Sequence, residues 1–233
     1  MRSFIEAFSQ HDELNPKIWD NSTQTLIPDV REKLLEIANA FYKTLDLKFD
    51  IADILLVGSN ASYNYTKDSD LDIHLVCNFD LIDASQEIAQ LLFNCKKNEF
   101  NSRHDISIKG IPVEVYVEDI NSATLSNGIY SVMNNKWIKK PTKETFKYIE
   151  IGEKPIEKLV EKIRNIVTKQ DVKLLRETIN SLYMMRKNSL SIDGEYGKGN
   201  LLFKELRARG ILDELRTALD DAISKNLSLE SMN

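Results

Sequence analysis

The chain has 233 residues, of which 42% are hydrophobic and 29% charged, and its formal net charge is −5. This composition predicts one large or two small folded domains, and it argues against a protein that coats nucleic acid through its overall charge. The two cysteines have no metal-binding spacing, which predicts reduced thiols. The N-terminus lacks a signal-peptide core and no apolar run reaches about 20 residues, so we expect a cytoplasmic protein without a membrane span.

The first half of the chain predicts a helix followed by strands. Residues 1–25 are polar, and we expect them to wrap around a domain with Trp19 as their only large anchor. Apolar residues at helical spacing predict a helix from Pro28 to about Leu47. Ile54–Val57 predicts a buried strand, and the alternation in Leu71–Val76 predicts a second strand after an intervening loop.

The rest of the chain changes from mixed to purely helical patterns. We expect a helix over 82–94 that packs through Ile88, Leu91, Leu92 and Phe93, a hairpin of 106–108 and 113–117 around Lys109-Gly110, a hairpin of 129–133 and 136–138 around Asn134-Asn135, and helices over 155–169, 171–188, 199–208 and 211–226. Strands followed by helices predict the α+β class, with a catalytic domain over 1–150 and a helical domain over 151–233.

The most informative segment is Leu55–Val76, LLVGSNASYNYTKDSDLDIHLV. Asp70 and Asp72 stand two residues apart at a strand and therefore share a face, where like charges repel unless a cation neutralises them. Mg²⁺ prefers such hard oxygen ligands. The turn at Gly58-Ser59 offers a close backbone approach and donors for a phosphate. Together these parts predict metal-assisted transfer of a phosphoryl or nucleotidyl group.

A third carboxylate is expected, because a two-metal site normally needs more than two. Glu114 lies between Val113 and Val115 in a strand that otherwise predicts burial. An unpartnered buried carboxylate is costly, and sharing a metal with the two aspartates removes that cost. Asp105, at the start of the preceding strand, is the alternative third ligand. Glu118 shares the face of Glu114 near the strand end, where we expect it to be solvated.

The order of these motifs resembles the DNA polymerase β-like nucleotidyltransferase superfamily over about residues 27–120. The matching features are an apolar strand, Gly58-Ser59, Asp70-x-Asp72 about ten residues later in a second strand, and an acid at position 114. Shorter pieces, SDLDIHL and GEYGKGNLLFKELR, also resemble small phage and bacterial nucleotidyltransferase-like proteins. The resemblance implies a nucleotidyltransferase palm, a mixed sheet flanked by helices, with an appended helical domain.

The same resemblance implies a two-metal enzyme. Two Mg²⁺ or Mn²⁺ ions would be held by the three acids, which are then both metal ligands and catalytic residues. An acceptor hydroxyl would attack the α-phosphorus of an NTP or dNTP, and pyrophosphate would leave. The candidate nucleotide-binding residues are Gly58, Ser59, Tyr65, Ser69, Tyr130 and Lys204. Lys204 enters this set through its charge and its place on a helix preceded by glycines, with an ordinary solvated helix charge as the alternative. Tyr65 enters it as a ring that either stacks on a base or packs its loop against the domain.

The acceptor stays open between a short oligonucleotide, a nucleotide, a protein side chain that includes the enzyme's own tyrosines, an RNA end and a small molecule. Template-independent synthesis of a short nucleotide signal is favoured, since no template-binding module is visible. The alternative is a non-catalytic module that keeps the fold and binds a nucleotide or a toxin partner. His74 shares the face of the aspartates and is either a site residue or a hydrogen-bonded strand residue, while His11 has no constellation around it.

Overall fold

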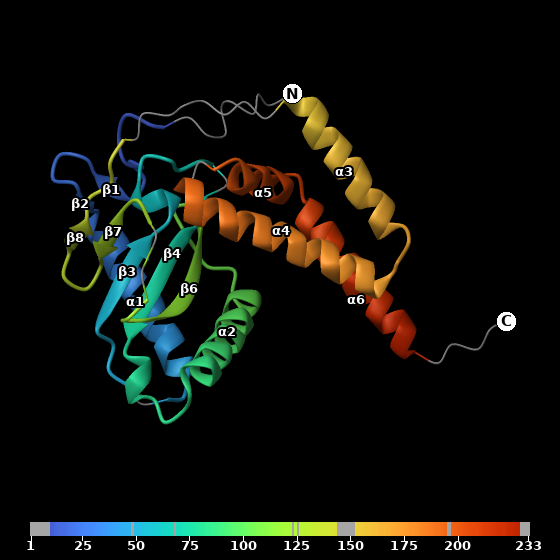
Figure 1. Ribbon diagram of the computed structural model, residues 1–233. Coiled ribbons are helices and arrows are strands. Elements are labelled where there is room, and N and C mark those ends of the chain that lie inside the picture. The colour runs from blue at the N-terminus through green and yellow to red at the C-terminus, as the bar shows by residue number, and fades with distance from the viewer. Residues whose placement is uncertain are drawn as a thin grey trace. The chain divides into compact units, whose positions relative to one another are not determined.

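The computed structural model describes residues 10–47, 49–67, 69–122, 124, 126–143, 152–194 and 197–228. The chain divides into two compact units, the first extending to residue 145 and the second beginning at residue 146 (Figure 1). The predicted boundary at residue 150 lies outside the described residues.

A six-stranded mixed sheet forms the centre of the first unit, with the order β5-β6-β4-β3-β7-β8 (Figure 1). The strands are β3 Asp53–Val57, β4 Leu71–Cys77, β5 Ser107–Ile108, β6 Ile111–Asp119, β7 Ile129–Ser131 and β8 Lys136–Lys139. The pair β4–β6 is parallel and the other pairs are antiparallel. The α+β class and both predicted hairpins are therefore confirmed. Lys109 and Gly110 turn with φ of 51° and 77°, as a two-residue hairpin loop requires.

The two faces of this sheet differ because its strands alternate in character. Leu56, Ile73 and Val115 represent the apolar face and are fully buried. Helix α1, Pro28–Thr44, contacts β4, and helix α2, Gln86–Arg103, contacts β6. The opposite face carries the polar side chains of β4 and β6, with the buried apolar residues of β3 beside them. This second face holds the candidate site.

Residues 1–9 of the predicted N-terminal wrap lie outside the described residues; from residue 10 onward the segment covers one edge of the core, as predicted, but through more than one anchor. It forms a small hairpin of β1 Trp19–Asp20 and β2 Thr25–Leu26. The Trp19 ring stacks on Trp137 at a centroid distance of 4.7 Å, and its Nε1–H donates to the carbonyl of Asn60. Leu14 and Ile18 are equally buried, so Trp19 is not the only large anchor of this segment.

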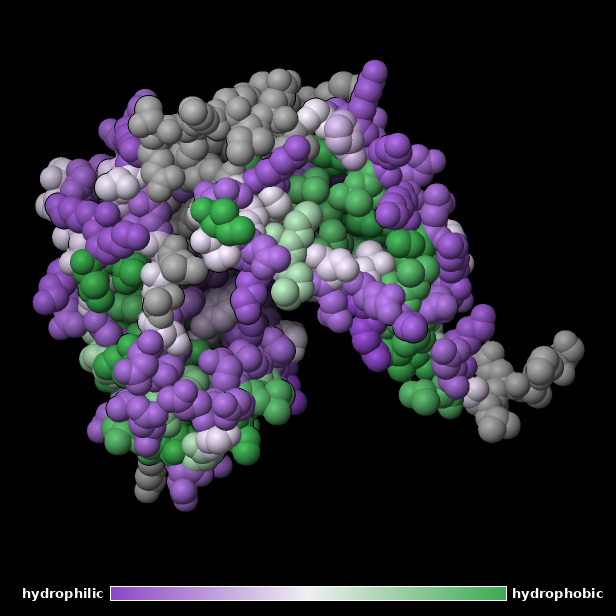
Figure 2. Space-filling model, in the orientation of Figure 1, coloured by the Kyte–Doolittle hydropathy of each residue, from purple (hydrophilic) through white to green (hydrophobic). Residues whose placement is uncertain are grey.

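Helix α2 differs from its prediction in both its bounds and its packing face. It begins only after Ser85, whose hydroxyl accepts a hydrogen bond from the first turn, and it continues to Arg103. Three of the four residues expected to pack are exposed, and the buried positions on this helix are Ala89, Phe93 and Phe100. Ile88, Leu91 and Leu92 form an adjacent apolar face of α2 that is exposed. Figure 2 shows hydrophobic residues at the surface of this unit.

The second unit is helical, as predicted. Its helices are α3 Glu153–Val167, α4 Val172–Asp193, α5 Lys198–Ala208 and α6 Ile211–Leu227. Two glycines at the start of α5 have a packing reason: a Cβ at Gly197 would lie 2.2 Å from the Ser189 hydroxyl, and one at Gly199 would lie 2.9 Å from a carbonyl of α4. These contacts let the two helices approach closely. In the described part of the chain, no helix combines the length and apolarity that crossing a bilayer requires.

Candidate active site

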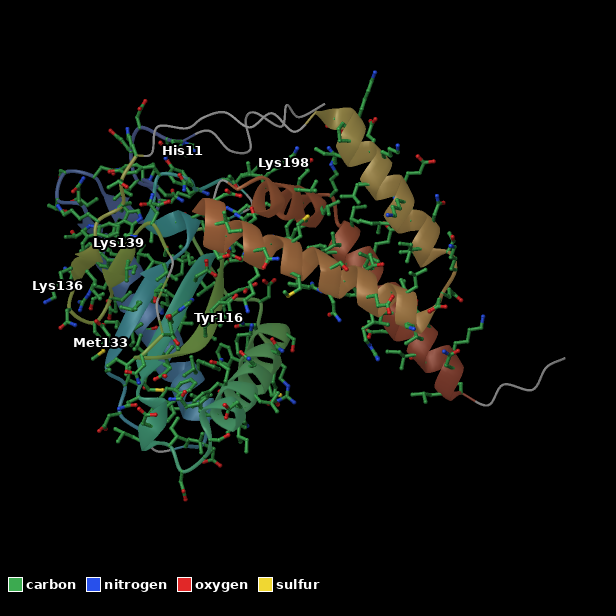
Figure 3. The ribbon with its side chains drawn as sticks, viewed as in Figure 1. His11, Tyr116, Met133, Lys136, Lys139 and Lys198 are labelled. Carbon is green, nitrogen blue, oxygen red and sulfur yellow. The ribbon has the colours of Figure 1, made fainter. Side chains whose placement is uncertain are left out.

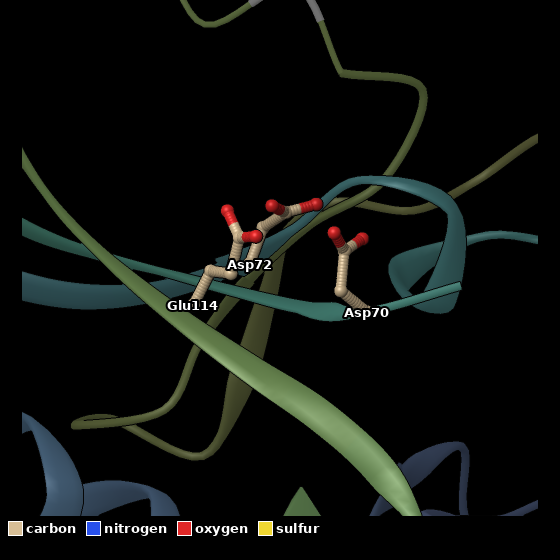
Figure 4. A group of neighbouring side chains, drawn as sticks. All are labelled: Asp70, Asp72 and Glu114. Carbon is tan, nitrogen blue, oxygen red and sulfur yellow. The ribbon is translucent and has the colours of Figure 1, made fainter. Parts of the chain in front are cut away.

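Three carboxylates meet on the polar face of the sheet. Asp70 directly precedes β4, Asp72 lies within it, and Glu114 lies on β6. The parallel register places Asp72 opposite Glu114, and one oxygen from each of the three carboxylates lies within 4.8 Å of the others. The three side chains point to the same side of the sheet (Figure 4). The structure thus brings together three acids that are up to 44 positions apart in the sequence.

The chemistry of this acidic cluster, Asp70, Asp72 and Glu114, fits a divalent cation. Each carboxylate is half-buried, and like charges at this separation repel. Hard oxygen donors in this number are what Mg²⁺ and Mn²⁺ take as ligands. Asp105, the alternative third ligand, is exposed and is not a member of the cluster. The geometry therefore favours Glu114 over Asp105.

Gly58 faces the cluster directly. Its φ is +76° with ψ of −162°, a conformation that residues with a side chain rarely adopt. A Cβ at Gly58 would lie 2.2 Å from Asp72 Oδ2. The sequence interpretation assigned this glycine to space for a phosphate, but the space it leaves is occupied by the Asp72 carboxylate. Its N–H donates to the hydroxyl of Ser126 at 3.0 Å, so this amide is bonded within the protein.

No protein-family model matches the sequence, and no curated protein matches it. Among solved structures, the chain is similar to the Elizabethkingia meningoseptica CdnE cyclic dinucleotide synthase, in a structure with GTP and Apcpp. The similarity covers 82% of this chain and 75% of that chain, with 16% sequence identity and a TM-score of 0.26. Similarity at this level carries no argument about the function of this chain, which depends on the residues themselves.

The turn after Gly58 is held by a network of small polar side chains. The Ser59 hydroxyl donates to the Ser69 hydroxyl at 2.8 Å, and Ser69 accepts a further hydrogen bond from the backbone N–H of Thr66. Asn60 is fully buried, and its Nδ2 donates to the carbonyl of Asp70 at 2.7 Å. Ser69 and Asn60 therefore connect the glycine turn to the start of β4. The role of Asn60 was missed in the sequence because an asparagine in a loop has no diagnostic pattern.

The predicted stacking residue Tyr65 already has an aromatic partner. The Tyr65 ring stacks on His11 at a centroid distance of 3.9 Å, and His11 Nε2 lies at hydrogen-bond distance, 2.9 Å, from the backbone carbonyl of Tyr65. Burial and the nearby Glu13 raise the pKa of the Tyr65 phenol. His11 is exposed, as expected, but the expectation that nothing surrounds it is wrong. The loop around Tyr65 is thus packed against the N-terminal segment.

Two further candidate nucleotide-binding residues lie away from the cluster or in the other unit. Tyr130 is fully buried on the opposite face of the sheet, where its ring meets Trp19 and Trp137. This position corrects its assignment to a nucleotide cleft, because strand alternation directs Tyr130 into the core. Lys204 lies half-buried on α5 of the second unit, and its role as a phosphate contact stays a prediction.

The polar face continues along β4 and β6 with a hydrogen-bonded pair. His74 Nδ1 lies 2.6 Å from Glu118 Oε2, and the hydroxyl of Thr124 donates to the other oxygen of Glu118 at 2.7 Å. Burial alone would raise the pKa of Glu118, but these hydrogen bonds outweigh it and hold the pKa below its ordinary value. The expectation that Glu118 is solvated is therefore wrong. For His74, the structure shows the hydrogen-bonded strand residue that was one of the two alternatives.

Three residues beside Glu114 were missed in the sequence. Tyr116, two positions further along β6, donates its phenol O–H to Glu114 Oε2 (Figure 3 labels this tyrosine). Lys97 of α2 places its ammonium 4.5 Å from the centroid of that ring. The Asn101 side chain pairs with both the N–H and the C=O of Val115, as a neighbouring strand would. The shared face of positions 114 and 116 was the one available signal.

Proposed function

We propose that this chain is a metal-dependent nucleotidyltransferase that moves a nucleoside monophosphate from an NTP or dNTP to a hydroxyl acceptor. The observation that carries the proposal is the convergence of Asp70, Asp72 and Glu114 within 4.8 Å, beside the turn at Gly58. Three half-buried acids with oxygens within 4.8 Å of one another repel, so their arrangement is best explained by a cationic partner. The order of these motifs in the sequence agrees with this class of enzyme.

The three acids would hold two Mg²⁺ or Mn²⁺ ions, which when bound stabilise charge on the attacking and leaving oxygens. Asp70 and Asp72 share one strand face, so both can bind on the side of the glycine turn. Glu114 comes from the neighbouring strand and closes the opposite side. In this arrangement the protein itself mainly positions the reacting groups and neutralises their charge.

The proposed reaction is a displacement at the α-phosphorus. The acceptor oxygen forms a bond to the α-phosphorus while the bond between the α-phosphorus and its bridging oxygen to the β-phosphate breaks. The electron pair leaves with pyrophosphate, and the hydroxyl proton passes to solvent. Ser59, the residue directly after Gly58, is the one we assign to a phosphate of the leaving group.

We further propose that the first domain, 1–150, performs the chemistry, and the assignment of Lys204 of the helical domain, 151–233, to a phosphate stays a prediction from the sequence. A triphosphate carries several negative charges, and the acidic first-domain site needs such cations to accept it. The acceptor remains open between a short oligonucleotide, a nucleotide, a protein side chain and a small molecule. Template-independent synthesis of a short nucleotide signal is the form we favour.

The proposal is tested by incubating the purified chain with each labelled NTP and dNTP and with Mg²⁺ or Mn²⁺, and by resolving the products by mass. Intact-protein mass from the same reactions reads modification of the chain itself. Asp72→Asn and Glu114→Gln should abolish product, while the exposed Asp105→Asn should retain it. Equal behaviour of Asp72→Asn and the parent, with nucleotide still bound, would instead favour a non-catalytic binding module.

A further inference from the structure

The environment of Tyr116 sets it apart from an ordinary packing tyrosine. It is half-buried, and its phenol O–H is directed at a carboxylate of the acidic cluster, Glu114, two positions earlier on the same strand face. A phenylalanine would fill the same volume, so packing alone does not call for the hydroxyl. The hydroxyl is explained by what it does to Glu114: a hydrogen bond to one carboxylate oxygen fixes the rotation of that side chain.

The donor itself is held in place by two neighbouring elements. The Lys97 ammonium contacts the Tyr116 ring at 4.5 Å, and the His74 ring lies 5.0 Å from it between centroids. The Asn101 amide pairs with the backbone of Val115, the residue between donor and acceptor. Helix α2 therefore fixes the backbone and the ring together, which makes this hydrogen bond a rigid support for Glu114.

We propose that Tyr116 is a positioning residue of the metal site, which holds the Glu114 carboxylate in the orientation that meets a cation shared with Asp70 and Asp72. This inference rests on the proposed function, since it assumes that the cluster binds metal. Hydrogen-bond partners that orient metal ligands typically change metal affinity by about 10- to 100-fold when removed. We expect a loss of that size in Tyr116→Phe.

The test is a double-mutant cycle read by Mn²⁺ affinity, from the electron paramagnetic resonance signal of free Mn²⁺. The variants are Tyr116→Phe, Glu114→Gln and the two combined. Tyr42→Phe is the matched control, because it also removes a single phenol hydrogen bond, here to the carbonyl of Phe49 on the other side of the unit's core. Thermal unfolding of each variant verifies that it folds.

The proposal expects weaker Mn²⁺ binding in Tyr116→Phe, unchanged binding in Tyr42→Phe, and no additional loss when Tyr116→Phe is placed in the Glu114→Gln background. Wild-type affinity in Tyr116→Phe, or a full additive loss in the double variant, overturns it, because the tyrosine would then not act through Glu114. Absence of Mn²⁺ binding in the parent also overturns it.

Nucleotide transfer is measured on the same proteins. If Mn²⁺ binding shows the expected coupling between Tyr116 and Glu114 but no NTP or dNTP gives product, the positioning role stands and the proposed function is refuted. When product does form, Tyr116→Phe should lower kcat and leave KM for the nucleotide within about 2-fold, since its effect is on the orientation of a metal ligand and not on nucleotide contacts.

Discussion

Replacing Gly58 with alanine separates two physical effects that the structure assigns to this position. The first is backbone strain, since φ of +76° with ψ of −162° costs a residue with a side chain about 1–3 kcal/mol. The second is a collision with the acidic cluster. The added Cβ would lie 2.2 Å from Asp72 Oδ2, whereas ordinary contact begins at 3.4 Å, so the carboxylate must move by about 1.2 Å.

The expected result of Gly58→Ala is a loss of both stability and metal affinity. Metal–ligand distances tolerate changes of only about 0.2 Å, so a displaced Asp72 should weaken Mn²⁺ binding at least about 10-fold, or about 1.4 kcal/mol. Gly110→Ala is the matched control: its φ is +77°, but nothing lies within 4 Å of the added Cβ. It should lose stability through strain and bind Mn²⁺ like the parent.

The assay combines thermal unfolding without metal and Mn²⁺ titration of the three proteins. Parental Mn²⁺ affinity in Gly58→Ala would refute the reasoning about Asp72. Loss of nucleotide transfer together with parental Mn²⁺ affinity would return Gly58 to the role inferred from the sequence, which is space for a phosphate.

Three further predictions use other parts of the first unit. Asn101→Ala removes the partner of two backbone groups on β6 and should cost about 1–3 kcal/mol of unfolding free energy in denaturant titrations, while the exposed Asn98→Ala one turn away should stay within about 0.5 kcal/mol. Asp72→Asn removes one of three mutually repelling charges, so it should raise the melting temperature measured without metal. It should also abolish the increase in melting temperature that we expect Mg²⁺ to produce in the parent. A lower metal-free melting temperature in this variant would contradict the reasoning. The pKa of Glu118 is lowered by hydrogen bonds that include the one with His74. The contribution of Glu118 to the free energy of unfolding is therefore present above the unfolded-state pKa, near 4.5, and is lost as the pH falls through the folded-state pKa. Glu118→Gln should reduce the loss of stability at acid pH, and an unchanged pH dependence of unfolding would count against the His74–Glu118 pair.

Local patterns in the sequence were sufficient wherever periodicity or turn chemistry decides the structure. The helices of the second unit, the Lys109-Gly110 hairpin and strand β4 follow from apolar spacing, a positive-φ turn and strict alternation. The shared face of Asp70 and Asp72 needs only the period of a strand. These features depend on residues that are neighbours in the chain, and the sequence therefore predicts them directly.

Where prediction failed, two faces of one element were both plausible. Helix α2 has apolar side chains on more than one face, and only tertiary contacts, such as those of the Phe93 ring with Phe49 and Phe79, select Phe93 over Leu91. Tyr130 follows Ile129 in β7, and a one-residue change of register would exchange the faces of the two. The pairing with β3 places Tyr130 in the core.

By itself, the sequence predicted a class of chemistry from two carboxylates at strand spacing after a glycine turn, with a third acid in a later strand. Only the tertiary structure decided which third acid joins them, because the parallel register of β4 and β6 places Glu114 beside Asp72 and leaves Asp105 exposed. It also revealed that Tyr116 donates a hydrogen bond to Glu114. A side chain at position 58 would collide with the Asp72 carboxylate, which explains the glycine there. Such contacts join residues that are distant in the chain or depend on side-chain direction, and hydrophobic periodicity encodes neither.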